Sequence, residues 1–192
     1  MRHNSGLSRA FGSMWVFVLG LTVLASGWGV DVAGAASGKE IDASVDVMLE
    51  KFEKNVGGAK QFLADAKGVL VFPKVIKAGF GIGGEYGEGA LRIGGKTVDY
   101  YNTVAGSYGW QIGAQFRTIV IVFLNADTLK RFRNSAGFQV GVDGSVVVIE
   151  LGAGASIDSR KFNDPIVGFI FDQKGLMVNL TLEGSKITKL NK

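Results

Sequence analysis

The chain has 192 residues, 47% of them apolar, so it can bury one good hydrophobic core and has little room for a second. Glycine occurs 29 times and proline twice, which excludes a disordered low-complexity chain and favours many strands and tight turns. The formal net charge of +4 is mildly basic and does not by itself single out a partner. Cysteine is absent, so disulfides are excluded and stability must come from packing.

Residues 1–35 have the pattern of a secretory signal peptide. Arg2 and Arg9 give a basic start, an apolar run follows, and Ala33-Gly34-Ala35 supplies the small residues of a cleavage site. We therefore predict that the chain is exported. The alternative is an uncleaved N-terminal anchor, because no charged residue occurs between Ala10 and Val30.

Two helices are predicted after this segment. Apolar side chains recur at intervals of three and four from Ile41 to Val56, which is typical of an amphipathic helix, and Gly57-Gly58 ends it. A second, short helix is predicted over about 59–66. Such stripes usually face a core, so we expect both helices to pack on a sheet. In the alternative, the first helix lies on a membrane.

From Gly68 onwards the pattern is that of strands and turns. An apolar run over 69–72 is either halted by Pro73 or placed by it at a sheet edge. The segment 79–89 carries glycine on nearly all of one face, and Gly94-Gly95 predicts a hairpin.

The core strands are predicted within 106–125. From Tyr108 to Phe116 apolar and polar side chains alternate, which predicts a half-buried strand, whereas 119–124 is continuously apolar and predicts a strand buried on both faces. Glycine inside these strands weakens them unless the sheet bends sharply or another backbone packs close. We therefore expect a closed or strongly coiled sheet.

The remaining elements complete an α+β fold. Asn125 is predicted to cap a short helix that ends at Asn134, and Asp143-Gly144 predicts a hairpin between strands at 138–142 and 146–151. Further strands are predicted at 166–171, 176–182 and 187–190. The predicted architecture is two N-terminal helices packed on a glycine-rich, mostly antiparallel, barrel-like β-sheet, with one short inserted helix.

The residue inventory argues against an enzyme. His3 is the one histidine and lies in the predicted signal peptide, so the mature chain lacks the residues for Ser-His-Asp or Cys-His catalysis and for the usual zinc and copper sites. Gly79, Gly81 and Gly84 match G-x-G-x-x-G, but a strand-like segment follows instead of a helix, so we reject a dinucleotide site. We predict no catalytic residues, no cofactor and no metal. A pair of carboxylates is the remaining enzymatic alternative.

Basic side chains lie near aromatic ones at two places, the 72–73 corner and the predicted short helix. This combination suits phosphate headgroups at an anionic bilayer, although a solvated surface is an equal alternative. We do not expect nucleic acid as a partner of an exported protein. The candidates for headgroup contact are Lys67, Lys74, Lys77, Lys130, Arg131 and Arg133, and those for acyl-chain contact are Phe72 and the apolar face of the first helix.

Several short segments, spread over about residues 42–190, form a pattern in their order and spacing. They are Ala66-Lys67-Gly68-Val69, 79–84, Gly109-Trp110-Gln111-Ile112-Gly113-Ala114, 120–125 with Leu129 and Phe132, Val140-Gly141, Gly175-Leu176-Met177 and Leu182-Glu183-Gly184-Ser185. Together these segments resemble the SYLF domain, a Ysc-type actin-binding and lipid-binding domain. The resemblance implies a non-enzymatic phospholipid-binding module: eukaryotic members bind phosphoinositides and some bind actin filaments, and bacterial members are exported.

We therefore expect residues 36–192 to be a single SYLF-like domain of the bacterial periplasm or cell envelope. Its expected partner is anionic phospholipid at a membrane surface, with which it associates peripherally. The alternative is an envelope structural or protein-interaction module without a lipid site, whose partner is a protein. The sequence predicts no oligomeric state.

Overall fold

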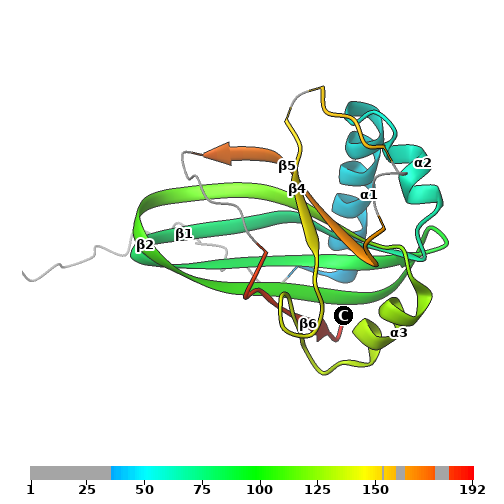
Figure 1. Cartoon of the computed structure of the whole chain (residues 1–192). Coiled ribbons are helices and arrows are strands. Elements are labelled where there is room, and N and C mark those ends of the chain that lie inside the picture. Colours follow the sequence, from blue (N-terminus) through cyan, green and yellow to red (C-terminus); the bar gives the residue numbers. More distant parts are fainter. Residues whose placement is uncertain (1–35, 153, 159–162, 176–181) are drawn as a thin grey trace, which may run out of the picture. The chain divides into compact units, whose positions relative to one another are not determined.

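The computed structural model describes residues 36–152, 154–158, 163–175 and 182–192, with the backbone alone at 80–81 and 107–112. The predicted signal peptide, residues 1–35, and nearly all of the predicted strand at 176–182 lie outside the described residues. The described part is an α+β fold with a curled, mixed sheet (Figure 1). Its elements are the helices α1 (Gly38–Asn55), α2 (Ala59–Ala64) and α3 (Ala126–Asn134), and the strands β1 (Gly68–Ile93), β2 (Lys96–Phe123), β3 (Phe138–Gln139), β4 (Val147–Glu150), β5 (Ile166–Gly175) and β6 (Lys186–Leu190).

Helix α1 begins at a capping box. The backbone N–H of Glu40 donates to Ser37 Oγ at 3.3 Å, and the backbone N–H of Ser37 donates to Glu40 Oε2 at 2.7 Å, which satisfies two otherwise free amides of the first turn. Ile41, Val45 and Phe52 are buried, so the predicted apolar stripe is confirmed. Helix α2 ends at Ala64, two residues earlier than predicted.

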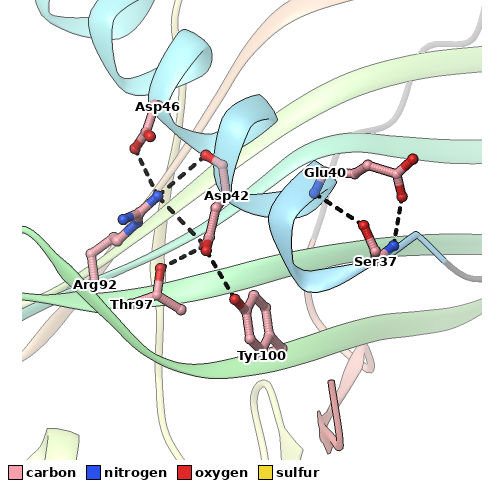
Figure 2. Close-up of polar contacts among 7 residues, drawn as sticks. All are labelled: Ser37, Glu40, Asp42, Asp46, Arg92, Thr97 and Tyr100. Atoms are coloured by element: carbon pink, nitrogen blue, oxygen red, sulfur yellow. Dashed lines mark hydrogen bonds and ion pairs between the residues drawn. The ribbon is translucent and has the colours of Figure 1, made fainter.

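Polar contacts fix α1 to the closed end of the β1–β2 hairpin (Figure 2). Asp42 accepts hydrogen bonds from Thr97 Oγ1 at 2.6 Å and from the Tyr100 hydroxyl at 2.9 Å. Arg92 donates to Asp46 Oδ1 at 2.7 Å and to the backbone oxygen of Asp42 at 3.2 Å. Because these bonds reach two turns of α1, they set the helix's position along the hairpin.

The hairpin itself is the longest feature of the fold. β1 and β2 pair antiparallel from Ile93 opposite Lys96 to Gly68 opposite Phe123. Gly94 and Gly95 form the turn with φ of 57° and 78°, the left-handed conformation that a two-residue hairpin loop requires of both residues. The predicted hairpin is confirmed.

The two halves of β1 lie against each other, because the hairpin bends sharply near its middle. A Cβ atom at Gly89 would lie 2.0 Å from the carbonyl oxygen of Val71, and one at Gly79 would lie 2.4 Å from Gly83 Cα. A Cβ atom at Gly87 would lie 2.7 Å from a methyl group of Val75. Only glycine permits these approaches. The expected strongly coiled sheet is therefore confirmed, with close backbone packing as its cause.

β2 is the central strand of the sheet. Its second half pairs antiparallel with β5 and its first half with β6, while β1 lies along its other edge. Pro73 lies at a register irregularity of β1. Among the described residues, no strand pairs with the far edge of β1, and an edge strand is where a proline, which has no N–H to donate, is tolerated.

The predicted hairpin at Asp143-Gly144 is wrong. The chain does turn at residues 141–143, but β3 pairs with β6, and β4 pairs with β5 in parallel. The physical reason is that β5 and β6 are themselves paired with the central strand β2. Their free edges are therefore firmer partners for β3 and β4 than these two short strands would be for one another. The sheet is accordingly mixed, though mostly antiparallel as predicted.

Side chains of the central strands alternate between two apolar cores. Ile119, Ile121 and Phe123 lie in an inner core inside the curl, together with Phe132 of α3. Val120 and Val122 lie in an outer core beneath α1 and α2. The predicted burial of 119–124 on both faces is confirmed. Asn125 caps α3 as predicted, its Oδ1 accepting from the backbone N–H of Thr128 at 3.0 Å.

Replacing Gly89 with alanine tests the backbone packing. We expect Gly89→Ala to lower the free energy of unfolding by about 1–3 kcal/mol, because the new methyl group must displace the backbone of Val71. Gly106→Ala is the matched control, since nothing lies within 4 Å of its Cβ position, and should stay within about 0.5 kcal/mol. Urea unfolding followed by circular dichroism measures both. Equal losses at the two glycines would contradict close packing as the role of Gly89.

Candidate functional site

Near the bend, the polarity of the sheet is the reverse of that of an ordinary half-buried strand. Such a strand buries its apolar side. Here Gln115 and Arg117 are 1% and 2% exposed, whereas Ala114 is exposed and Phe116 is 39% exposed. The inner face of β2 therefore becomes polar toward the bend, and apolar side chains remain on its outer face.

The inner side holds a buried ion pair. Arg117 donates to Glu85 Oε2 at 2.5 Å, and the two side chains are 1% and 3% exposed. Lys77, opposite Gln115 in the strand register, is also buried. A buried charge is tolerated only beside an opposite one, so Arg117 and Glu85 hold each other inside the curl.

The outer side of the same strands borders a hollow of about 530 Å³ between α1 and the sheet. We call it the outer hollow. Most of its lining residues are apolar or have small side chains such as serine and threonine, and two lysines, Arg117 and Asp172 complete the lining. The lining residues are Ala43, Ser44, Val47, Met48, Pro73, Lys74, Phe116, Arg117, Thr118, Asp172 and Lys174.

Two lysines of the outer hollow are available to a ligand. Lys74 Nζ lies 5.1 Å from the ring centroid of Phe116, and Lys174 is opposite Phe116 in the β2–β5 register. Both lysines are exposed, and no carboxylate of the described chain forms an ion pair with either. Asp172 is engaged elsewhere, by Lys51 at 2.7 Å.

Apolar side chains around the two lysines are unusually accessible. Val47 of α1 is 58% exposed, and Ile76, which is opposite Phe116 in the β1–β2 register, is 39% exposed. The next outward pair along the hairpin, Ala78 and Ala114, is exposed as well. The outer hollow thus combines positive charge with an apolar surface.

Of the candidate residues on β1 or directly before it, only two are accessible. Lys74 borders the outer hollow, and Lys67 is exposed where β1 begins. Lys77 is only 9% exposed and faces the polar interior, because it follows Val75 on the inward side of β1. Phe72 is fully buried in the inner core. Neither Lys77 nor Phe72 lies on a surface that a lipid can reach, and both drop out of the candidate site.

The candidates on α3 form a separate group. Lys130 and Arg131 are exposed, and Arg131 donates to Thr128 Oγ1 at 3.1 Å. This helix packs by Leu129 on Gly68, at the start of β1. Lys74 is seven positions after Lys67 along the strand, a distance of about 23 Å. The candidates therefore do not form one continuous site.

Arg133 is tied into the fold. Its Nε donates to Asp99 Oδ2 at 2.9 Å, and Lys189 pairs with the same carboxylate. Burial alone would raise the pKa of Asp99, but the hydrogen bonds and charges of Lys189 and Arg133 outweigh it and hold that pKa below its usual value. Arg133 therefore joins α3 to β2, and its guanidinium is engaged by Asp99 and not left for a headgroup.

Sequence reasoning missed four residues of this surface, Val47, Ile76, Phe116 and Lys174. Strict alternation from Tyr108 to Phe116 was a usable signal, but alternation does not say which side faces the core. The pairing that brings Lys174 beside Phe116 joins segments about sixty residues apart, and no local pattern encodes it.

Among the helices of the described residues, none has both the length and the apolar character needed to cross a membrane.

Residues 104–192 match the model of the family Ysc84, described as Las17-binding protein actin regulator. The matched part starts within β2 and includes α3 and the strands β3 to β6. β1 and both N-terminal helices precede it, but β1 pairs with β2 along nearly its whole length, so the matched part shares one sheet with residues outside it. No curated protein gives a significant match to the chain.

Removing one partner of the buried ion pair tests whether the polar interior is structural. We expect Glu85→Gln to lower the free energy of unfolding by about 3–5 kcal/mol, because Arg117 would stay buried without a counter-charge. The double variant Glu85→Met with Arg117→Met should recover most of that loss. Glu150→Gln, at an exposed strand residue, is the control. Chemical unfolding measures all three, and a Glu85→Gln variant as stable as the control would contradict the assignment.

Proposed function

The chain belongs over residues 104–192 to the Ysc84 (SYLF) family, and on this premise we propose that it is a non-enzymatic protein that binds anionic phospholipid at a membrane surface. The binding surface is the outer hollow together with Ile76 beside it. Lys74 and Lys174 contact the anionic headgroups, and the exposed apolar side chains enter the layer of lipid beneath them.

The main support for this proposal is the pattern of burial near the bend, where the polar side chains of β2 face the interior and the apolar ones face outward. Exposing apolar side chains to water is unfavourable in free energy. A contiguous group of such side chains on a protein surface therefore usually marks an interaction site. Here Val47, Ile76 and Phe116 lie beside two lysines without ion pairs in the described chain. A membrane interface offers both an apolar layer and negative charge.

Magnitudes show that the charge alone is insufficient. A lysine near an anionic membrane contributes about 1 kcal/mol, so two contribute about 2 kcal/mol, or roughly thirty-fold in affinity. A fully buried Phe, Ile or Val side chain contributes about 1.5–3 kcal/mol, less when it is already partly covered. Charge and apolar contact must therefore act together, with charge selecting the membrane and apolar burial holding the protein there.

The cellular location belongs to the same proposal. A signal peptide at residues 1–35 would deliver the domain to the periplasm or cell envelope, where it meets the surface of an anionic membrane. The lack of histidine after His3 and of cysteine throughout supports a binding role over a catalytic one.

A second candidate function rests on the family description, which names binding to a protein, Las17. In this candidate the same exposed apolar surface is a contact for an envelope protein and takes no lipid. Structural and interaction roles of this kind use apolar patches with a polar border, as found here.

Co-sedimentation with vesicles tests the proposal. We expect the full chain to bind phosphatidylglycerol vesicles at low salt, to bind less at high salt, and to bind phosphatidylcholine vesicles weakly, because screening weakens headgroup contacts. The double variant Lys74→Ala with Lys174→Ala should lose about thirty-fold in affinity for the anionic vesicles. Phe116→Ser should weaken binding at both salt concentrations, because it removes apolar contact.

The matched control removes two charges elsewhere, in Lys130→Ala with Arg131→Ala. Both residues are exposed, so the control changes the net charge equally and leaves the outer hollow intact. Equal or greater loss in the control would move the headgroup contact to α3. If none of these substitutions changes binding, the outer hollow is not the site. If the protein binds neither kind of vesicle, the protein-interaction module is favoured.

A further inference from the structure

Exposed apolar side chains also lie on the second half of β1 and the first half of β2. Tyr86 and Val104, which are opposite each other in the β1–β2 register, are 46% and 45% exposed. Ile82, nearer the bend, is 74% exposed. None of the three lines the outer hollow, so the membrane surface proposed above does not account for their exposure.

This second group mirrors the first about the bend. The bend lies where the β1–β2 register is irregular, at residues 80–82. Phe116 is paired with Ile76 on one side of it, and Val104 is paired with Tyr86 on the other. Each of these four residues is five or six positions from the middle of the bend along its own strand. The two exposed pairs are therefore about equally far from the bend, at most about 20 Å at the rise of a strand.

The two pairs face away from each other. A Cβ atom at Gly87 would point inward, as the side chain of Glu85 does, and would lie 2.7 Å from a methyl group of Val75 on the other half of β1. The two halves of β1 therefore meet through their inward sides. Successive side chains of a strand point to opposite faces, so Tyr86 points away from the first half of β1 and Ile76 away from the second.

The bend between the two pairs carries no charge. By sequence, neither 78–84 nor 104–116 contains aspartate, glutamate, lysine or arginine. Ala78, Ile82 and Ala114 are exposed there. The helices α1, α2 and α3 lie toward the other end of the hairpin (Figure 1). The bend is thus an uncharged end of the sheet that these helices leave uncovered.

Lysines lie beside both pairs. On one side are Lys74 and Lys174, which flank the phenylalanine ring of the first pair. On the other side is Lys186, which is exposed and opposite Val104 in the β2–β6 register. From the bend outward, the exposed side chains are first apolar, then aromatic, as at Tyr86, and then cationic. Membrane-binding surfaces have the same order, because tyrosine rings lie at the interface and lysines reach the headgroups.

We propose that the protein inserts the bend of the β1–β2 hairpin end-on into the interfacial layer of an anionic membrane. Ile82 and Ala114 enter first. The two exposed pairs follow on opposite sides, up to the level at which the lysines meet the headgroups. This inference rests on the proposed function and adds a second contact surface to it, formed by Ile82, Tyr86 and Val104.

The choice of a lipid layer as the partner follows from the two opposite faces. A flat membrane that touched the outer hollow alone would leave Ile82, Tyr86 and Val104 in water. A folded protein partner would cover one side of the bend. A lipid layer surrounds the part of a protein that enters it, so it covers both sides at once.

The insertion is shallow. Among the described residues, no strand pairs with the outer edge of β2 between 105 and 114. Backbone groups on a free edge need hydrogen-bond partners, which the hydrocarbon core lacks and the hydrated headgroup layer supplies. We therefore expect the bend to reach a depth of about 5–10 Å, at the boundary between headgroups and acyl chains.

Fluorescent labels on the two sides of the bend test the insertion. Because the chain has no cysteine, Ile82→Cys and Ala114→Cys can each carry one environment-sensitive NBD label. We expect phosphatidylglycerol vesicles to shift the emission of both labels to shorter wavelength, and 5-doxyl lipid to quench both labels more than 12-doxyl lipid does. Val98→Cys is the control: Val98 is exposed near the Gly94-Gly95 turn, at the other end of the hairpin, and its label should not shift.

Removing apolar contact without changing the charge gives a second readout. Ile82→Ser should lower the affinity of the full chain for phosphatidylglycerol vesicles by about ten-fold, because the isoleucine no longer buries its apolar surface in lipid. Val98→Ser is the matched control and should leave the affinity unchanged. Both side chains are exposed, so neither substitution disturbs a core.

A label that enters lipid at position 114 but stays in water at position 82 would overturn end-on insertion and leave the outer hollow as the membrane site. An Ile82→Ser variant that binds as tightly as the wild type would do the same. Stronger quenching by 12-doxyl lipid would contradict the shallow depth. A wild type that binds no vesicles would overturn both this inference and the proposed function.

Discussion

The contact between the two halves of β1 is the constraint on which the rest of the structure depends. Gly87 and Gly89 lie against the strand segment from Val71 to Val75 so closely that no side chain fits between them. Once this contact forms, one face of the β1–β2 hairpin is enclosed and the other is left for α1 and α2. Both apolar cores and the reversed polarity near the bend follow from that division.

The enclosed face explains why apolar side chains are exposed near the outer hollow. With Arg117 paired to Glu85 inside, alternation along β2 places Phe116 outside, and strand pairing adds Ile76 and Lys174 beside it. The ion pair contributes little net stability in comparison with an apolar core, because desolvation offsets most of its attraction. Its consequence is orientation: it fixes which side of the strand faces the interior, and so which side chains a partner meets.

Local sequence signals predicted much of this fold. The apolar stripe from Ile41 to Val56, the Gly94-Gly95 turn and the Asn125 cap depend on neighbours within a few residues, and each is confirmed. The excess of glycine indicated a strongly coiled sheet for the correct physical reason. Such signals specify an element without its partner, which is why the hairpin at Asp143-Gly144 was predicted wrongly. The candidate site was less predictable, since the burial of Phe72 depends on Gly89, which packs against its ring from further along the chain.

If the outer hollow binds a membrane, Phe116 faces outward onto it while Gln115 faces inward. The absence of cysteine from the chain allows a direct test of these two orientations. Phe116→Cys and Gln115→Cys are each labelled with a water-soluble maleimide, with and without phosphatidylglycerol vesicles. We expect fast labelling at position 116 that the vesicles suppress, and slow labelling at position 115 in both conditions. Faster labelling at 115 than at 116, or labelling at 116 that bound vesicles leave unchanged, would contradict it.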